Sequence, residues 1–234
     1  MNVDDLEIRK FEALAARWWD PHSEFKPLHD INPLRVNYIN NKINVADQYV
    51  LDIGCGGGIL AEALAHHGAR VTAIDLGEAS LSVARLHQLE SGLNIDYRKI
   101  SAEGLAAQLP GHFDVVTCLE MLEHVPSPES VVKACHTLVK PGGLVFFSTI
   151  NRNPKAYLFA ILGAEYVLHL LPRGTHDYRK FIKPSELAHW CRDAALDLCD
   201  QIGMGYNPVT RKYSMQPDLD VNYLAVYRRA GEPQ

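Results

Sequence analysis

The feature that most constrains this chain is an apolar run that breaks into glycines, Val50-Leu51-Asp52-Ile53-Gly54-Cys55-Gly56-Gly57-Gly58. Glycines at the point where a strand turns into a helix let the backbone approach a ligand with no Cβ in the way. A second apolar segment ends at Asp75, about 20 positions further on, where a carboxylate can accept hydrogen bonds from both ribose hydroxyls. The pattern therefore predicts a nucleotide-cofactor site.

The glycine run does not fit a dinucleotide. That fingerprint needs a third glycine three positions after the second, and Ile59 stands there. Asp52 also places a negative charge beside the loop, which disfavours a pyrophosphate and favours a cationic ligand. Asp52, Gly54, Gly56 and Gly58 instead resemble the first motif of class I S-adenosylmethionine-dependent methyltransferases, whose donor carries a ribose, an adenine and a sulfonium.

Strand-like and helix-like segments alternate along the first 150 residues. Apolar runs predict strands over 70–75, 95–100 and 113–118, and a helix end, a turn and a further strand over 138–147. Between them, apolar residues recur three and four positions apart, as at Leu60 and Leu64. Alternation predicts a parallel sheet. With the motif resemblance it implies an α/β, Rossmann-like class I methyltransferase fold with a mostly parallel central sheet flanked by helices.

Length and composition predict one domain. The chain has 234 residues, and 47% of them are hydrophobic, which is enough to bury a full core. We divide it into an N-terminal helical lid (1–40), a cofactor-binding core (45–150), an apolar and basic insertion (151–183) and the C-terminal part of the sheet (184–234). The five cysteines form no CxxC pair, which argues against a zinc site or a disulfide framework and fits a reducing cytosol.

A second cluster of chemistry-bearing residues, Glu120-Met121-Leu122-Glu123-His124, follows the strand at 113–118. An open α/β sheet has its ligand crevice at that edge. If the segment begins a helical turn, Glu120, Glu123 and His124 point to one side and offer two carboxylates and an imidazole, a set suited to Mg²⁺ and also to Mn²⁺, Fe²⁺ or Zn²⁺. Such a metal would chelate two adjacent phenolic oxygens. His124 or the downstream His176 is alternatively a general base.

The segment from Lys155 to Leu171 is strongly apolar and predicts an inserted helix. It is too short and too polar to span a bilayer, which takes about 20 apolar residues. Residues 151–183 hold six basic and two acidic side chains, whereas the whole chain has a net charge of −5. This pattern predicts either docking on an anionic membrane surface or a buried helix over the substrate pocket. We expect a cytoplasmic protein that associates peripherally with the inner (plasma) membrane.

Narrower motifs make the resemblance specific. The chain is similar to the ubiquinone biosynthesis O-methyltransferase family from about residue 8 to Tyr223. The motifs that carry this are Lys10-Phe11-Glu12-Ala13, Arg17-Trp18-Trp19-Asp20, Glu120-Met121-Leu122-Glu123-His124-Val125, Asn151-Arg152-Asn153, Gly174-Thr175-His176-Asp177 and Val221-Asn222-Tyr223.

The resemblance implies both O-methylations of the ubiquinone pathway, on a polyprenylated catechol-type phenol and on demethylated ubiquinol. It also implies S-adenosylmethionine as donor and a divalent metal, of which Mg²⁺ is the preferred candidate. Other ubiquinone-biosynthesis proteins are implied as partners. Matching positions imply that Arg35 pairs with the donor's methionine carboxylate, Asp75 takes its ribose and Leu119 packs on its adenine. Leu119 departs from the methionine frequent in relatives, but its volume is similar. The further expected donor-site residues are Asp52, Gly54, Gly56 and Glu103.

Two other functions also fit parts of the pattern. The Glu120 to His124 cluster is similar to that of small-RNA 2′-O-methyltransferases, although the net charge of −5 and the lack of an extended basic stripe argue against nucleic acid. A non-catalytic, lipid-docked subunit that binds the donor is the other alternative. The intact acidic and histidine positions argue against it.

Overall fold

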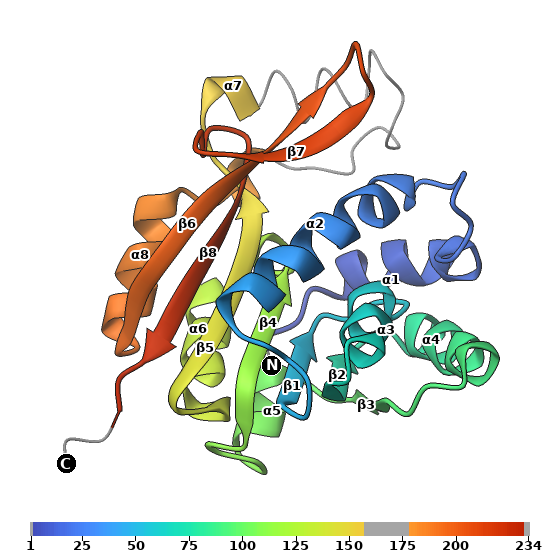
Figure 1. The fold of residues 1–234 in the computed structure, drawn as a ribbon, viewed down its shortest axis with the longest axis horizontal. Coiled ribbons are helices and arrows are strands. Elements are labelled where there is room, and N and C mark those ends of the chain that lie inside the picture. The colour runs from blue at the N-terminus through green and yellow to red at the C-terminus, as the bar shows by residue number, and fades with distance from the viewer. Residues whose placement is uncertain (1, 157–177, 232–234) are drawn as a thin grey trace.

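The computed structural model describes residues 2–156 and 178–231 (Figure 1). Its helices and 3₁₀ turns are α1 (Asp5–Leu14), η1 (Ala15–Arg17), α2 (Lys26–Lys42), α3 (Ile59–His66), α4 (Glu78–Ser91), α5 (Ala102–Ala106), η2 (Leu122–His124), α6 (Pro128–Leu138), α7 (Pro154–Ala156), η4 (Tyr178–Lys180) and α8 (Pro184–Asp193). Its strands are β1 (Tyr49–Ile53), β2 (Arg70–Asp75), β3 (Asp96–Lys99), β4 (Phe113–Leu119), β5 (Val139–Ile150), β6 (Leu196–Asn207), β7 (Lys212–Gln216) and β8 (Asn222–Arg229).

All these strands join one sheet in the order β3-β2-β1-β4-β5-β8-β6-β7. The first five are parallel, and β8, β6 and β7 are added antiparallel. The predicted α/β fold with a mostly parallel sheet is confirmed. Because the carboxyl ends of β1, β2 and β4 lie at one edge, the segments that follow them meet there, which is where such sheets bind ligands.

Helices cover both faces of the sheet. Apolar residues of α5, α6 and α8 pack on one face, in a core that includes Val145 and Phe147 of β5. Those of α2, α3 and α4 pack on the other face, with Leu144 and Phe146. Successive side chains of a strand point to opposite faces, so β5 reads as a continuous apolar run because both of its faces are buried.

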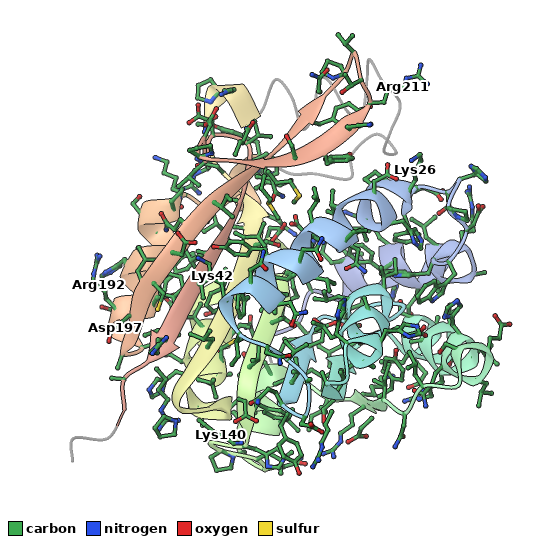
Figure 2. The ribbon with its side chains drawn as sticks, viewed as in Figure 1. Lys26, Lys42, Lys140, Arg192, Asp197 and Arg211 are labelled. Carbon is green, nitrogen blue, oxygen red and sulfur yellow. The ribbon has the colours of Figure 1, made fainter. Side chains whose placement is uncertain are left out.

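The N-terminal segment and the β6–β7 hairpin lie at the ligand edge. In Figure 1 the hairpin extends beyond the rest of the sheet, over the N-terminal end of α2. Figure 2 shows Arg211 in the hairpin turn and Lys26 at the start of α2 at this end of the molecule, whereas Lys140 lies at the opposite end.

The predicted insertion is described only at its ends. α7 begins where the apolar helix over 155–171 was expected, but residues 157–177, and with them His176, lie outside the described residues. Three basic side chains of the insertion bind acidic groups of the protein: Arg152 pairs with Glu186, Lys155 with Asp218 and Asp220, and Lys180 with Asp4 and Glu7. In the described part of the chain, no helix combines the length and apolarity that crossing a bilayer requires.

Candidate active site

The glycine loop after β1 needs its glycines. Gly54, Gly56 and Gly58 have φ of 73°, 52° and 89°, in the left-handed region that side chains with a Cβ rarely adopt. A Cβ on Gly58 would also lie 2.3 Å from the Tyr97 hydroxyl oxygen. The loop therefore runs close to its neighbours and presents backbone groups to the crevice, as the sequence predicts.

Asp75 is held by this loop. Its Oδ2 accepts a hydrogen bond from the Gly56 N–H at 2.9 Å, and its Oδ1 accepts one from the Gly77 N–H at 2.8 Å. Each carboxylate oxygen has two lone pairs, so both can still accept a hydroxyl proton. Asp75 is thus fixed at the end of β2 with both oxygens able to accept a further hydrogen bond.

Asp52 is a buried carboxyl beneath the loop. Thr117 Oγ1 donates to its Oδ1 at 2.8 Å, and burial raises the pKa of Asp52 to about 7. A carboxyl buried without a cation favours the protonated form. A sulfonium bound nearby would favour the carboxylate instead.

Glu103 and Leu119 are two further residues predicted for the donor site. Glu103 Oε1 accepts hydrogen bonds from Asn2 Nδ2 at 3.0 Å and Ser130 Oγ at 2.8 Å. Burial raises the pKa of Glu103, but these hydrogen bonds outweigh it and the net shift is downward. Leu119 is buried at the end of β4. Both side chains line one cavity together with Asp52, Gly54, Gly56 and Asp75.

Glu120 is the most connected side chain of the site. Its carboxylate forms an ion pair with buried Arg35 and accepts hydrogen bonds from Ser148 Oγ at 2.8 Å and from Asn222 Nδ2 at 3.1 and 3.2 Å. Its φ is 53°, an unusual value for a residue other than glycine. Glu120 therefore joins α2, β5 and β8 at the ligand edge.

Glu123 and His124 have other partners. Thr149 Oγ1 donates to Glu123 at 2.9 Å, and burial, followed by the negative charge of Glu120, raises the pKa of Glu123 to about 7. His124 Nδ1 lies 3.0 Å from Glu7 Oε2 on α1. Burial lowers the pKa of His124, but the Glu7 hydrogen bond outweighs it and the pKa is raised, while the pKa of Glu7 falls well below its usual range.

Glu120, Glu123 and His124 line one cavity, but the helical turn on which their predicted shared side depended does not begin at Glu120. Ser148 and Thr149 are neighbours in β5 and point to opposite faces, so the carboxylates that they bind approach from different faces. The physical reason is the backbone at Glu120: its left-handed φ breaks the chain direction, and only Leu122–His124 forms a 3₁₀ turn. Within residues 2–156 and 178–231 no three acidic, histidine or cysteine side chains group as metal ligands would. In this arrangement the three do not fit a shared ion, and the metal stays a prediction.

The N-terminal segment covers the glycine loop. Trp18 lies so close that a Cβ on Gly56 would be 2.1 Å from its Cζ2 atom. Trp19 donates from Nε1 to the Gly57 carbonyl oxygen at 2.8 Å and stacks on the His87 ring at 3.4 Å between centroids. Two aromatic side chains therefore clamp this segment on the loop, as a lid over the donor end would require.

One cavity of about 810 Å³ is lined by the predicted site residues that the structure describes: Arg35, Asp52, Gly54, Gly56, Asp75, Glu103, Leu119, Glu120, Glu123 and His124. It is lined by α1, α2, the glycine loop, the segment after β4 and the β6–β7 hairpin. Pockets for small ligands span about 300–1,000 Å³, so this one is at the large end, with room beyond one donor molecule.

Sequence comparison decides the family. The chain is 70% identical over 223 residues to the ubiquinone biosynthesis O-methyltransferase of Azotobacter vinelandii, covering 95% of this chain and 96% of the relative. It is 68% identical over 228 residues to that of Pseudomonas paraeruginosa, covering 97% and 98%. The chain belongs to the ubiquinone biosynthesis O-methyltransferase family. Residues 29–201 also match the family model described as a methyltransferase domain.

Solved structures agree on the fold. A magnesium protoporphyrin IX methyltransferase from Synechocystis with bound S-adenosylmethionine superposes with a TM-score of 0.66 at 17% identity, covering 97% of this chain and 98% of that one. A possible histamine N-methyltransferase from Thermotoga maritima gives 0.68 at 16% identity, covering 95% and 99%. The family has a class I methyltransferase fold, a fold that binds S-adenosylmethionine in the Synechocystis structure.

Several residues of the site could not be recognised from the sequence alone. Glu7 is one of many acidic residues in an exposed helix pattern, and nothing in its spacing points to His124. Asn222 was noticed only within the Val221-Asn222-Tyr223 motif of the family. Tyr206 and Tyr213 line the cavity from the hairpin, and two tyrosines seven positions apart give no signal of a ligand.

Proposed function

We propose that this chain transfers the methyl group of S-adenosylmethionine to a hydroxyl of a polyprenylated catechol-type phenol and of demethylated ubiquinol, giving ubiquinol. The observation that carries the proposal is the single cavity that joins a donor-type edge to an apolar space under the β6–β7 hairpin. The proposal is also supported by relatives named ubiquinone biosynthesis O-methyltransferase, to which this chain is 68–70% identical.

The donor end supports recognition of each part of S-adenosylmethionine. The Asp75 carboxylate would accept the ribose hydroxyls, Leu119 would pack on the adenine, and Arg35 would bind the methionine carboxylate with an N–H that Glu120 does not use. Asp52 supplies the negative charge that a sulfonium favours. The lid formed by 1–40 would exclude water from the reacting groups.

The transfer itself is an in-line displacement. The phenolic oxygen forms a bond to the methyl carbon as the bond from that carbon to sulfur breaks, so S-adenosylhomocysteine leaves and the hydroxyl proton must be accepted. Glu123, with its pKa raised to about 7 by burial, is suited to accept that proton near neutral pH. His124 is less suited, because Glu7 favours its protonated form.

Metal assistance of this transfer stays a prediction from the sequence. A divalent ion would hold the two adjacent oxygens of a catechol and lower the pKa of the reacting hydroxyl. Glu120, Glu123 and His124 would have to exchange their present protein partners to bind it.

Contact with an anionic membrane through 151–183 is a further part of the proposal, and a polyprenyl tail gives a reason for it. Sedimentation with anionic and with neutral vesicles tests it: binding that needs anionic lipid and falls as salt rises supports it. Equal binding to neutral vesicles argues against it. Association with other ubiquinone-biosynthesis proteins stays a prediction.

The test of the activity is methyl transfer from labelled S-adenosylmethionine to a short-chain demethylated ubiquinol, with EDTA and then with added Mg²⁺, Mn²⁺ or Zn²⁺. Activity that EDTA removes and a metal restores supports both the substrate and the metal. Activity that EDTA leaves unchanged supports the substrate and rejects the metal. Absence of transfer under every condition rejects the proposed function.

A further inference from the structure

The cavity has a wall that the donor does not need. The first wall is the edge formed after β1, β2 and β4, which carries the donor residues. The second is the β6–β7 hairpin, which supplies Met204, Tyr206 and Tyr213. Facing it, Leu28, Ile31 and Arg35 recur at helical spacing and therefore share one side of α2.

The hairpin is a fixed platform because glycines let it pack closely. A Cβ on Gly203 would lie 1.7 Å from the Asp218 carbonyl oxygen, and one on Gly205 would lie 2.6 Å from Gln216 Oε1. The chain after β7 is tied down as well, since Asn151 Nδ2 donates to the Leu219 carbonyl oxygen at 3.0 Å. A surface held in this way is already shaped before a ligand arrives.

Two tyrosines form the aromatic part of the platform. Tyr206 and Tyr213 are register partners, so both side chains are on the same face of the hairpin, and their ring centroids are 4.8 Å apart. Burial raises the pKa of Tyr213 to about 12, which keeps its hydroxyl neutral. Neutral aromatic rings beside the apolar side chains of α2 suit a flat aromatic ligand.

Asn222 adds an unused hydrogen-bond acceptor at the junction of the two walls. Its Nδ2 donates to both Glu120 oxygens, which fixes how the amide is turned. Its Oδ1 is buried and has no hydrogen-bond partner among the described residues. The same is true of Nε of Arg35, whose guanidinium pairs with the Glu120 carboxylate. A buried polar atom without a partner is costly, so a ligand that pairs with it gains that free energy.

The chemistry of these two atoms separates the two ligands. Arg35 Nε–H can only donate, which suits the carboxylate of the methyl donor. Asn222 Oδ1 can only accept, which suits the proton of a ring hydroxyl. Both residues line the same cavity.

We propose that the aromatic head of the acceptor binds between the Tyr206–Tyr213 pair and the Leu28–Ile31 face of α2, with a ring hydroxyl donating to Asn222 Oδ1. The acceptor site is then built by the hairpin and β8, not by the insertion alone. This inference rests on the proposed function and assigns the acceptor subsite of that function.

The test separates acceptor binding from donor binding in four variants: Tyr213→Ala, Tyr213→Phe, Asn222→Ala and Val209→Ala. For Tyr213→Ala we expect the KM for a short-chain demethylated ubiquinol to rise about tenfold or more, since an aromatic contact is lost. The Kd for S-adenosylmethionine should change less than about twofold. Tyr213→Phe keeps the ring and should restore most of the wild-type KM. Val209, 90% exposed in the hairpin turn, is the matched control and should leave both constants unchanged.

Asn222→Ala should lower kcat/KM for the acceptor about ten- to a hundredfold with the donor Kd retained, because one hydrogen bond to the reacting ring is lost. A donor Kd that rises as much as the acceptor KM overturns the assignment, since Asn222 would then serve the donor's ammonium group. An unchanged acceptor KM in both Tyr213→Ala and Asn222→Ala also overturns it.

A measurement on the unaltered protein keeps the inference testable if a variant does not fold. With S-adenosylhomocysteine present, adding short-chain demethylated ubiquinol should slow amide hydrogen exchange in 203–216 relative to 70–75. Equal exchange with and without the quinol overturns the inference. If the wild-type protein transfers methyl groups while these tests fail, the subsite is wrong and the proposed function stands. Wild-type inactivity would instead reject the proposed function.

Discussion

The two walls of the cavity are built in different ways. The edge proposed to bind the donor uses backbone: Gly54 and Gly56 adopt left-handed turns, and the carboxylate of Asp75 binds the N–H groups of Gly56 and Gly77, all within 24 residues of chain. The wall proposed to bind the acceptor uses side chains from α2, the β6–β7 hairpin and β8, separated by more than 160 residues. The first wall is a local structure that different members of a fold can share when they bind the same donor. The second wall is assembled by tertiary packing, so its side chains can differ between proteins that bind different acceptors.

The largest effect that we expect tests whether transfer can be separated from donor binding. Glu123→Gln keeps the shape of the side chain but removes its capacity to take a proton, so kcat should fall about a hundredfold or more. The donor Kd, measured by calorimetry, should stay within about twofold. Glu62→Gln is the matched control, because Glu62 is equally buried on α3 and pairs with His87 outside the cavity. A matching loss of donor affinity in Glu123→Gln would show that the two roles are not separate.

The next effect is on the donor edge alone. Asp75→Ala should weaken binding of S-adenosylmethionine about ten- to a hundredfold, since hydrogen bonds to a charged group contribute about 1.5–3 kcal/mol. Calorimetry with S-adenosylhomocysteine measures the same loss without turnover. Asp114→Asn is the control, because Asp114 binds Lys140 and the Tyr49 N–H at the start of β4 and does not line the cavity. Unchanged affinity in Asp75→Ala would remove Asp75 from the donor site.

A smaller effect concerns the carboxyl beneath the glycine loop. Burial raises the folded-state pKa of Asp52 to about 7, above its value near 4 in an unfolded chain, so the folded state holds this proton more tightly. Its contribution to stability is therefore complete below about pH 4 and is lost as pH rises towards 7, with a slope of at most about 1.4 kcal/mol per pH unit. Urea unfolding across this range should show a steeper loss of stability in wild type than in Asp52→Asn, which keeps only the contributions of other groups such as Glu123. Parallel curves would contradict the assignment.

The smallest effect tests the clamp of the lid. Trp19→Phe keeps an aromatic ring against His87 and loses the hydrogen bond to the Gly57 carbonyl oxygen, which should cost about 1 kcal/mol. For a chain of this size that lowers Tm by about 2–4 °C. Thermal unfolding measures it. An increase in Tm would mean that the clamp strains the loop.

What could be predicted from the sequence follows the same division. The glycine run, Asp75 and the strands around them are neighbours in the sequence, so their spacing predicted both the fold and the donor type. The sequence also predicted Glu120, Glu123 and His124 as a cluster. Helical spacing would place the three on one side of a helix, but the backbone turn at Glu120 gives Glu120 and Glu123 separate hydrogen-bond partners. Glu7 and Asn222 reach the same cluster over more than 100 residues, and no pattern in their own surroundings could show it.

The place of β8 in the sheet has a consequence for biosynthesis. The strand follows every other strand in the chain, yet it lies between β5 and β6 and carries Asn222 to the Glu120 carboxylate. Until β8 is inserted, Glu120 lacks the Asn222 amide, and β5 lacks the partner that joins it to β6. Because a domain folds as a unit, the Glu120 end of the cavity is complete only after the last strand has been made.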